Sequence, residues 1–392
     1  MRILFLNHNV VRKGGTYYRA YNIGRHLVKH GHSVTLISIS EKSRWRIERE
    51  LDEGFEIIHS PDLFWGIGRS GWDPWDILKR IFYLHGHQWD IVHAWDCRPA
   101  VILPALYARQ QSLQVNGKLI IDWCDWWGRG GTQTERTGRL AKLFYGPIET
   151  FFEENFRTHA DGNTAISKAL YQRSLSLGVR SDKILLLPQG CNCSDQEILK
   201  REDARRYLGL SLDNPITLNV GALTSSEAKL FFDTVQLLFQ SHPDCRVVMI
   251  GNHNIQVPQI LKKDERFIET GYISESALKM YMAACDALLI TLADTIASRG
   301  RWPSKVNLFL TSGRAVVMTR VGDLAELLEH EEAAFIVDCT PSDIVNKLLQ
   351  LFNDPSLKYK FENRGRRVAN NILAWPLIVK KLENFYFCIR NQ

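Results

Sequence analysis

Short apolar runs alternate with longer amphipathic segments from the start of the chain. Residues 3–6 and 33–38 have the length and apolar character of strands. A helix separates them, and its apolar face is formed by Ala20, Ile23, Leu27 and Val28, with Arg19 off that face. Further strands are predicted at residues 91–93, 119–121, 162–165 and 184–187. This alternation predicts a parallel sheet that is covered by helices.

The alternation of predicted strands and helices is interrupted at residues 188–203, where Pro188-Gln-Gly190 precedes a largely polar run. A second series of strands is predicted at residues 215–220, 247–251, 286–290, 315–318 and 334–337. We therefore predict an α/β fold of two Rossmann-like domains that face each other across a cleft, where such folds bind ligands. The domains are residues 1–190 and 191–374, followed by an amphipathic segment over residues 375–392.

Composition is that of a globular protein: 392 residues, of which 45% are hydrophobic and 23% charged. No stretch approaches the roughly 18 to 20 apolar residues of a membrane-spanning helix, and no basic-then-apolar leader opens the sequence. We therefore expect a cytoplasmic protein. The eight cysteines lack the CxxC spacing of zinc sites, so free thiols are expected.

Basic charge is concentrated near the N-terminus. Residues 1–50 carry ten Lys or Arg and three acids, whereas the formal net charge of the whole chain is +6. Such an excess suits an anionic membrane surface or a polyanionic acceptor, and it suits equally a solvated face. Peripheral attachment of this N-terminal domain to the inner face of a membrane is therefore an open alternative. Nucleic acid is not expected, because no recognition motif accompanies the charge.

A series of different short motifs extends along nearly the whole chain. They comprise Gly14-Gly15, residues 31–34, residues 160–167, Pro188-Gln-Gly190, Gly221, and residues 269–273, 281–286, 303–305, 313–317 and 321–327. In these motifs the sequence resembles the retaining GT-B glycosyltransferases of family GT4. The resemblance implies a polysaccharide-biosynthesis enzyme that moves a sugar from a nucleotide-sugar donor to a glycan or lipid-linked acceptor. It also implies that residues 375–392 pack back on the first domain. The nucleotide sugar is a co-substrate, and no cofactor or metal is expected.

Polar residues and glycines follow the first predicted strand. Asn7, His8 and Asn9 are expected at the ligand-binding edge of the sheet. A catalytic base is one role for His8, and a hydrogen-bonded structural residue is the other. Gly14 and Gly15 would let backbone N–H groups approach an acceptor hydroxyl and a donor phosphate, respectively, although a plain tight turn explains them too.

Residues 122–131 combine carboxylates, three tryptophans and a glycine-rich turn after an apolar strand. Aromatic rings stack on the apolar faces of sugars, and Asp and Arg side chains bind hydroxyl and charged groups. We predict an acceptor site formed by Gly14, Arg19, Asp122, Trp126 and Arg129. Asp125 is expected to orient the acceptor, and a structural role for the run is the alternative.

Residues 298–305 place three cations next to a helix that is predicted to begin near Ser304. Cations and a helix N-terminus stabilise a leaving diphosphate. We therefore predict catalytic roles for Arg301 and Lys305 and a donor contact for Arg299. A solvated basic loop is the alternative.

The resemblance implies further donor contacts. Gly271, Tyr272 and Ile273 match the loop that binds the nucleobase through main-chain groups. Gly322 and Asp323 match another donor-facing loop. The remaining expected donor-site glycine is Gly221, directly after a strand of the second domain.

Two parts of the GT4 pattern are replaced. Gly300 and Leu308 occupy the positions of the family's two EX7E glutamates, so Asn307 is expected to take over a donor contact. Ala222 stands where the family has an arginine, and Glu227 lies near its lysine. Two alternatives to a transferase therefore stay open: a catalytically silent subunit that binds a partner transferase or a glycan, and a sugar-nucleotide epimerase.

Overall fold

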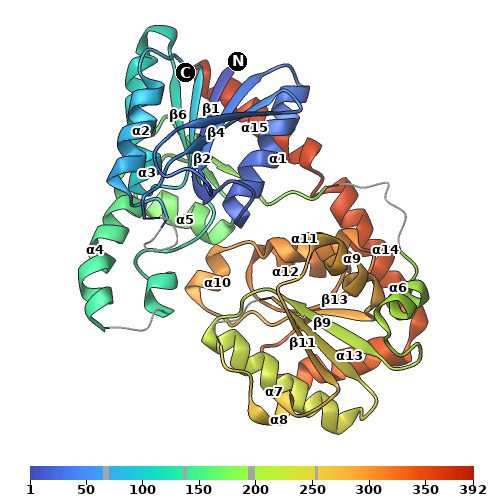
Figure 1. Cartoon of the computed structure of the whole chain (residues 1–392). Helices are drawn as coiled ribbons and strands as arrows, with labels where there is room; N and C mark the ends of the chain where they lie inside the picture. Colours follow the sequence, from blue (N-terminus) through green and yellow to red (C-terminus); the bar gives the residue numbers. More distant parts are fainter. Residues whose placement is uncertain (65–69, 136–138, 193–198, 252–254) are drawn as a thin grey trace. The chain divides into compact units, whose positions relative to one another are not determined.

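The computed structural model describes residues 1–64, 70–135, 139–192, 199–251 and 255–392 (Figure 1). Contacts divide the chain into two compact units. The first unit comprises Met1–Gln189, Gly300–Trp302 and Trp375–Gln392, and the second comprises Gly190–Arg299 and Pro303–Ala374.

The first unit is built on an eight-stranded sheet with the order β3-β4-β2-β1-β5-β6-β7-β8. All neighbouring strands are parallel except β3 and β4, which pair antiparallel at one edge. The strands are β1 (Arg2–Val10), β2 (Ser33–Ile39), β3 (Glu48–Asp52), β4 (Phe55–Ser60), β5 (Ile91–Trp95), β6 (Lys118–Trp123), β7 (Gly162–Ala165) and β8 (Ile184–Leu186).

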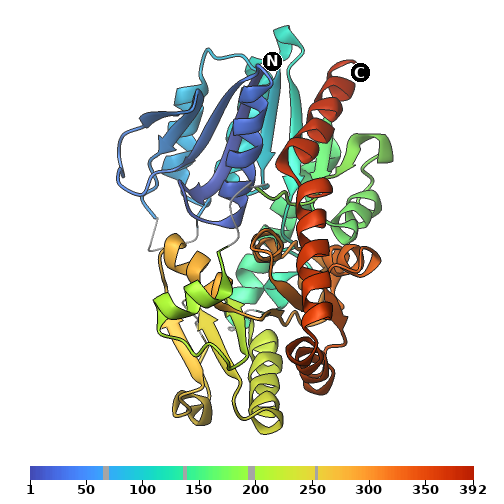
Figure 2. The same ribbon diagram turned by 90° about the vertical axis from the view of Figure 1, so that its right-hand side faces the viewer.

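Helices cover both faces of this sheet, because alternate residues of a strand point to opposite sides. Ile3 and Phe5 of β1 pack in one core cluster with α1 and α15, while Leu4 and Leu6 pack in another with α3 (Figures 1 and 2). The helices are α1 (Gly15–Lys29), α2 (Pro74–Leu84), α3 (Pro99–Gln111), α4 (Arg139–Asn155), α5 (Lys168–Ser176) and α15 (Trp375–Arg390), with 3-10 turns η1 (Leu113–Val115), η2 (Thr132–Glu135), η3 (Arg157–His159) and η4 (Ser181–Lys183).

The second unit has a six-stranded, fully parallel sheet with the order β11-β10-β9-β12-β13-β14. Its strands are β9 (Ile216–Val220), β10 (Arg246–Ile250), β11 (Phe267–Gly271), β12 (Ala287–Ile290), β13 (Ala315–Thr319) and β14 (Phe335–Val337). Its helices are α6 (Arg201–Leu208), α7 (Ser225–Ser241), α8 (Gln259–Lys262), α9 (Glu275–Ala284), α10 (Ile296–Gly300), α11 (Ser304–Thr311), α12 (Gly322–His330), α13 (Pro341–Asn353) and α14 (Pro355–Asn371).

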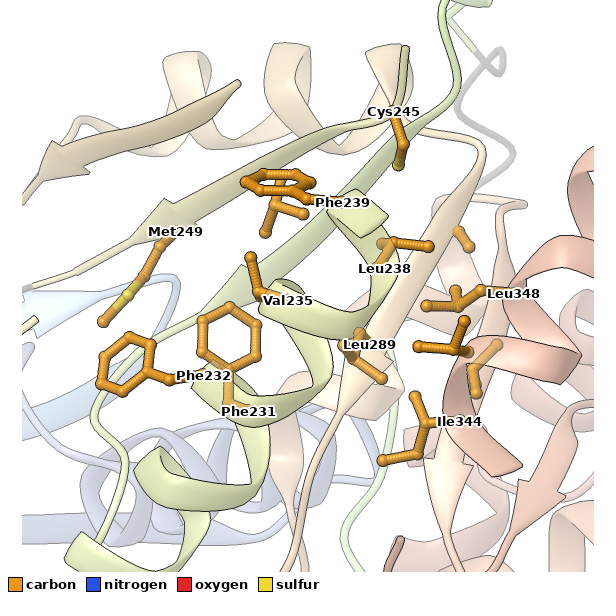
Figure 3. Packing of buried hydrophobic residues seen from close by; sticks show 14 of the residues in the cluster. Phe231, Phe232, Val235, Leu238, Phe239, Cys245, Met249, Leu289, Ile344 and Leu348 are labelled. Atoms are coloured by element: carbon orange, nitrogen blue, oxygen red, sulfur yellow. The ribbon is translucent and has the colours of Figure 1, made fainter. Parts of the chain in front are cut away.

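The main core of the second unit lies where α7 and α13 pack on the sheet. Phe231 and Val235 of α7 are fully buried in the same cluster as Leu289 of β12 and Ile344 of α13 (Figure 3). The buried positions of α7 are three or four residues apart, which is the spacing of a helix that buries one face; they are Ala228, Phe231, Phe232, Val235, Leu238 and Phe239.

The predicted fold class, α/β with two parallel sheets, is confirmed. Each of the apolar runs predicted as strands falls on an observed strand, and β3, β4 and β11 were not predicted. The sequence of β3, Glu-Arg-Glu-Leu-Asp, lacks apolar alternation because this strand lies at an edge and is largely exposed. None of the described helices has the length and apolarity needed to cross a membrane, and the seven described cysteines are free thiols.

A buried ion pair ties the first unit together. Arg19 of α1 and Asp122 of β6 are 1% and 0% exposed, and each of two guanidinium nitrogens, Nε and Nη2, lies 3.3 Å from a carboxylate oxygen. The same guanidinium donates to Leu187 O at 2.7 Å and to Pro188 O at 3.0 Å. The ion pair therefore joins the first helix, the sheet and the segment through which the chain leaves the unit.

A buried histidine sits beside this ion pair. Nδ1 of His93 is 2.6 Å from the Tyr386 hydroxyl of α15. Burial lowers the pKa of His93 to about 3, so the ring is neutral. Burial opposes ionisation of Asp122, but the Arg19 cation and hydrogen bonds from Cys124 and Thr164 outweigh it and lower the pKa of the Asp122 carboxyl.

Replacing Arg19 with Ala is expected to cost about 3 to 5 kcal/mol of unfolding free energy, because it leaves Asp122 buried without its cation. Urea denaturation measures this loss. Arg12 is the matched control, since it forms an exposed ion pair with Glu50, and Arg12→Ala should cost less than about 1 kcal/mol. If the two variants lose the same unfolding free energy, the buried ion pair of Arg19 does not stabilise the protein more than an exposed one.

Acid should weaken the first unit through His93. The folded-state pKa of about 3 lies below the ordinary 6.5, so the unfolded chain takes up a proton that the folded chain refuses. This contribution is complete above about pH 6.5 and is lost as the pH falls towards 3. His93→Gln, which keeps a partner for Tyr386, should flatten that part of the stability profile measured by urea denaturation from pH 7 downwards. An unchanged acid limb in this variant would show that other groups cause it.

Candidate functional site

Polar residues of the first unit gather where β1, β5 and β6 end. These strands are adjacent and parallel, so their carboxyl ends lie at the same edge of the sheet. His8 lies near the end of β1, Asp96 and Arg98 follow β5, and residues 124–131 follow β6.

Asp96 is the centre of this group. Its Oδ1 accepts a hydrogen bond from Trp127 Nε1 at 3.1 Å and from the Cys97 backbone N–H at 2.5 Å. Its Oδ2 lies 3.3 Å from His8 Nδ1 and 3.1 Å from Arg98 Nε. Asp96 also has a φ of 139°, a conformation that costs a non-glycine residue about 1 to 3 kcal/mol and persists where the surroundings hold it. The carboxylate thus fixes an imidazole, a guanidinium and an indole around one buried point.

The turn after β1 presents the start of α1. Asn9 Oδ1 accepts the Tyr17 N–H at 3.1 Å, and Gly14 has a φ of 84°. A Cβ on Gly14 would lie 2.7 Å from Asn9 Nδ2, so only glycine fits there. A Cβ on Gly15 would meet nothing within 4 Å, so there is open space over the first turn of the helix. The predicted approach to backbone N–H groups is therefore sterically free at Gly15.

The tryptophan-rich loop after β6 is held from α4. Glu153 accepts hydrogen bonds from the Trp127 and Gly128 backbone N–H groups, both at 2.7 Å, and from Trp123 Nε1 at 3.1 Å. Burial raises the pKa of Glu153 to about 7. Arg157 lies 3.9 Å from the centre of the Trp123 ring. These contacts fix the backbone of the loop from its inner side.

The outer side of this loop carries two of the predicted acceptor-site residues and Asp125, which is predicted to act in catalysis by orienting the acceptor. Asp125 and Arg129 are exposed, and Trp126 is half-buried. Trp126 Nε1 donates to Arg129 O at 2.7 Å, which folds the loop into a compact turn. Polar and aromatic groups are therefore presented together on a rigid support.

Two other predicted acceptor-site residues lie inside the unit. Arg19 and Asp122 bind each other in the core, and Thr164 Oγ1 also donates to Asp122. Their charged atoms are used by the fold and do not reach an acceptor. The sequence placed Arg19 off the apolar face of its helix, and nothing local indicates a partner 103 residues away.

Glycine turns follow three adjacent strands of the second unit. Gly221, Gly251 and Gly271 lie at the ends of β9, β10 and β11, and their backbones are linked by the bonds Gly221 N to Ile250 O, 2.7 Å, and Gly251 N to Gly271 O, 2.9 Å. A Cβ on Gly221 would lie 2.2 Å from Lys305 Nζ. The Lys305 ammonium group thus lies directly over the Gly221 backbone, at the carboxyl edge of the sheet, where open α/β sheets generally bind ligands.

Two helices of the second unit begin without a side-chain cap. Neither the side chain of Pro303, before α11, nor that of Val321, before α12, accepts a hydrogen bond from the first turn of its helix. Gly322 opens α12, and a Cβ there would lie 3.9 Å from Arg299 Cα. Helix N-termini carry partial positive charge and N–H donors, which suit an anion.

The start of α7 is different, because the helix closes itself. Thr224 N donates to Glu227 Oε2 at 2.8 Å, and Glu227 N donates to Thr224 Oγ1 at 3.4 Å. This capping box occupies the region where the family pattern has a lysine. Lys229 points elsewhere and pairs with Asp233 on the exposed side of α7.

The other predicted donor-site residues have varied surroundings. Arg299 binds Asp294 through two bonds of 2.6 and 2.7 Å. Asn307 is buried, and its Nδ2 donates to Gly190 O at 2.9 Å, so its amide holds the backbone of the second unit. Tyr272 is 83% exposed and Ile273 is half-buried.

The two predicted catalytic cations fall in different units, because Arg301 belongs to the Gly300–Trp302 segment of the first unit and Lys305 to the second. Asp323 lies in the first turn of α12. Within the described part of the chain, no group of three or more His, Cys, Asp or Glu side chains could hold a metal ion.

Family models match both halves of the chain. Residues 13–195 match the model of Glycosyltransferase Family 4, and residues 214–354 match the model of Glycosyl transferases group 1. No curated protein matches the sequence.

Solved structures match nearly the whole chain. Sucrose-phosphate synthase from Thermosynechococcus elongatus is 16% identical, with a TM-score of 0.72 and coverage of 99% of this chain and 98% of that chain. HepE from Anabaena, in complex with UDP and glucose, is 14% identical, with a TM-score of 0.70 and coverage of 99% and 100%. The catalytic domain of starch synthase IV from Arabidopsis thaliana, bound to ADP and acarbose, is 14% identical, with a TM-score of 0.71 and coverage of 100% and 99%. These similarities show the GT-B fold class.

Removing the Asp96 carboxylate is expected to destabilise the chain. Asp96→Ala leaves Trp127 Nε1 and the Cys97 N–H without their acceptor and should cost about 2 to 4 kcal/mol in urea denaturation. Asp96→Asn retains one oxygen for both donors and should cost about 1 kcal/mol. If the two variants lose the same unfolding free energy, the bonds that Asp96 Oδ1 accepts from Trp127 and Cys97 do not stabilise the protein.

Proposed function

Because the chain belongs to the GT4-like glycosyltransferases of the group 1 family, with the GT-B fold, we propose that it moves a sugar from a nucleotide-sugar donor to a glycan or lipid-linked acceptor. Retention at the anomeric carbon is part of this proposal and rests on the family. So does a role in polysaccharide biosynthesis at the cytoplasmic side of a membrane.

The observation that carries the proposal is the position of Lys305. Its ammonium group lies over the Gly221 backbone, next to the uncapped start of α11. A diphosphate held there would meet a cation and backbone N–H donors at once, which lowers the cost of the negative charge that develops on the leaving oxygen. The backbone N–H groups of Gly322 and Asp323 at the start of α12, with Arg299 beside them, are a second set of hydrogen-bond donors.

The nucleobase fits the loop after β11. Gly271 has a φ of 66°, and the following Tyr272 is almost fully exposed, so the main chain and an aromatic ring are both available. Bound UDP in HepE and bound ADP in starch synthase IV support a nucleoside diphosphate as the ligand class. Main-chain contacts would not by themselves select the base.

The acceptor fits the first unit. Trp126 and Arg129 present an aromatic face and a cation, and Asp125 presents a carboxylate that can orient a hydroxyl. Gly14 and Gly15 add the open first turn of α1. His8, held beside Asp96, supplies a nitrogen at the same edge of the sheet and is a second candidate for a hydroxyl contact.

One observation favours a catalytically silent subunit as the second candidate. Glu227 closes the start of α7 with its own carboxylate, and Leu308 and Gly300 bring no carboxylate to the positions of the family's glutamates. On the family pattern, this chain would therefore lack part of the usual donor machinery. Such a chain would bind a partner transferase or a glycan without turning over a donor.

Calorimetric titration with UDP, GDP and ADP and with their sugar conjugates tests the donor site. We expect micromolar binding of one nucleotide and at least tenfold weaker binding in Lys305→Ala, which equals about 1.4 kcal/mol. The reason is the loss of the cation at the diphosphate. Lys229→Ala is the matched control, because Lys229 pairs with Asp233 on the outer side of α7 and its removal should leave the affinity unchanged.

Absence of binding by every nucleotide would reject the transferase and favour the silent subunit. Conversion of a bound donor without any acceptor would instead favour an epimerase. Anomeric NMR of the product tests retention, and a product of inverted configuration would reject that part of the proposal.

A further inference from the structure

The helix α2 of the first unit is amphipathic in the opposite sense to a normal surface helix. Its side chains that point into the protein include charged ones, and several that point outwards are apolar. Phe82 and Leu78 are 73% and 48% exposed, whereas Asp76 and Arg80 are fully buried. A globular protein gains nothing from this pattern by itself, since exposed apolar side chains contribute no burial and buried charges cost desolvation.

Specific bonds fix the inner side of α2. Arg80 Nε donates to Asp76 Oδ1 at 2.7 Å, and its Nη1 donates to Asn7 O and Ala100 O, both at 2.8 Å. Asp73 caps the helix by accepting the Trp75 N–H at 2.9 Å. These bonds allow α2 little rotation about its axis, so Leu78 and Phe82 are kept on the outside.

Aromatic residues extend this outer face. Trp75, Leu78 and Phe82 are three and four residues apart, which places them in one stripe. Trp45 is 64% exposed, and its ring lies edge-on to Trp75 with centroids 5.9 Å apart. Trp75 Nε1 donates to Arg44 O at 3.1 Å and so holds the Trp45 segment against α2. We call Trp45, Trp75, Leu78 and Phe82 the α2 face.

Cations border the α2 face. Lys79 Nζ lies 4.4 Å from the centre of the Trp75 ring, and Arg49 lies 5.5 Å from that of Tyr83. Arg46 is exposed next to Trp45. Some cations elsewhere in the N-terminal region are paired with acids, as Lys13 is with Glu41, and Arg49 Nε itself lies 3.9 Å from Glu56 Oε1. The cationic border of the α2 face therefore rests mainly on Arg46 and Lys79.

We propose that the α2 face binds the surface of an anionic lipid bilayer. Tryptophan rings suit the interface between headgroups and acyl chains, Leu and Phe side chains insert just below it, and lysine and arginine contact anionic headgroups. The aromatic and cationic composition favours lipid over a purely apolar protein partner. This inference goes beyond the proposed transfer reaction and does not depend on it.

Co-sedimentation of the full chain with vesicles tests the proposal. Vesicles of phosphatidylcholine with about 30% phosphatidylglycerol should bind the protein, and pure phosphatidylcholine should bind it more weakly. The double variant Leu78→Gln and Phe82→Gln should bind the anionic vesicles at least about tenfold more weakly, because two inserted apolar side chains are lost. Thermal unfolding of this variant should match wild type, since both side chains are exposed.

A matched double variant, Ile260→Gln and Tyr359→Gln, serves as the control. Both residues are 68% exposed, and both lie in the second unit, outside the α2 face. This control should bind vesicles as the wild type does. The variant Arg46→Gln and Lys79→Gln should lose affinity for the anionic vesicles alone and show a weaker dependence on salt.

Three results would overturn the proposal. These are no binding to anionic vesicles, equal binding by wild type and the Leu78/Phe82 variant, and a wild-type dimer that the same variant converts to a monomer without any vesicle binding. The last result would assign the α2 face to contact with a second copy of the chain. Nucleotide binding, measured separately, is unaffected by any of these outcomes.

Discussion

The buried pair of Arg19 and Asp122 is the contact on which the first unit depends. The Arg19 guanidinium binds Asp122 of the sheet and the backbone carbonyls of Leu187 and Pro188. Because Arg19 belongs to α1, these bonds also fix the helix that begins at the Gly14-Gly15 turn. The hydrogen-bonded His93 and Tyr386 add the C-terminal helix to the same centre. A polar cluster of this kind is stable only when every member has its partner, so it requires all of these segments to be in place together.

Much of the fold follows from local pattern. Apolar runs such as residues 3–6 and 315–318 predict strands because a strand that is buried on both faces must be apolar throughout. The edge strand β3 was not predicted, because its residues are largely exposed and polar. The predicted helix start near Ser304 agrees with α11, and residues 124–131 follow β6 as the polar residues after an apolar run indicate, whereas residues 298–300 belong to the helix α10.

The direction of individual side chains was beyond reach of the sequence. Asp122 and Asp125 are only three residues apart, but Asp122 lies in β6 and is buried in the core, whereas Asp125 lies in the loop after β6 and is exposed. The difference comes from Arg19 and Thr164, which are distant in sequence and supply the partners of Asp122. Asn307 was likewise expected at a ligand, and its amide instead binds the Gly190 carbonyl. The unusual backbone of Asp96 has no local signal at all.

The capping box of α7 has a consequence for where negative charge can be accommodated in the second unit. The first turn of a helix cannot be closed by its own carboxylate and also receive the anion of a ligand. With Glu227 in that place, the first turn of α7 is closed to a phosphate, whereas the first turn of α11 holds no acid and contains Lys305, whose ammonium group lies over Gly221 after β9. A single acidic residue thus removes one helix N-terminus of this sheet edge from anion binding and leaves the start of α11 as the cationic one.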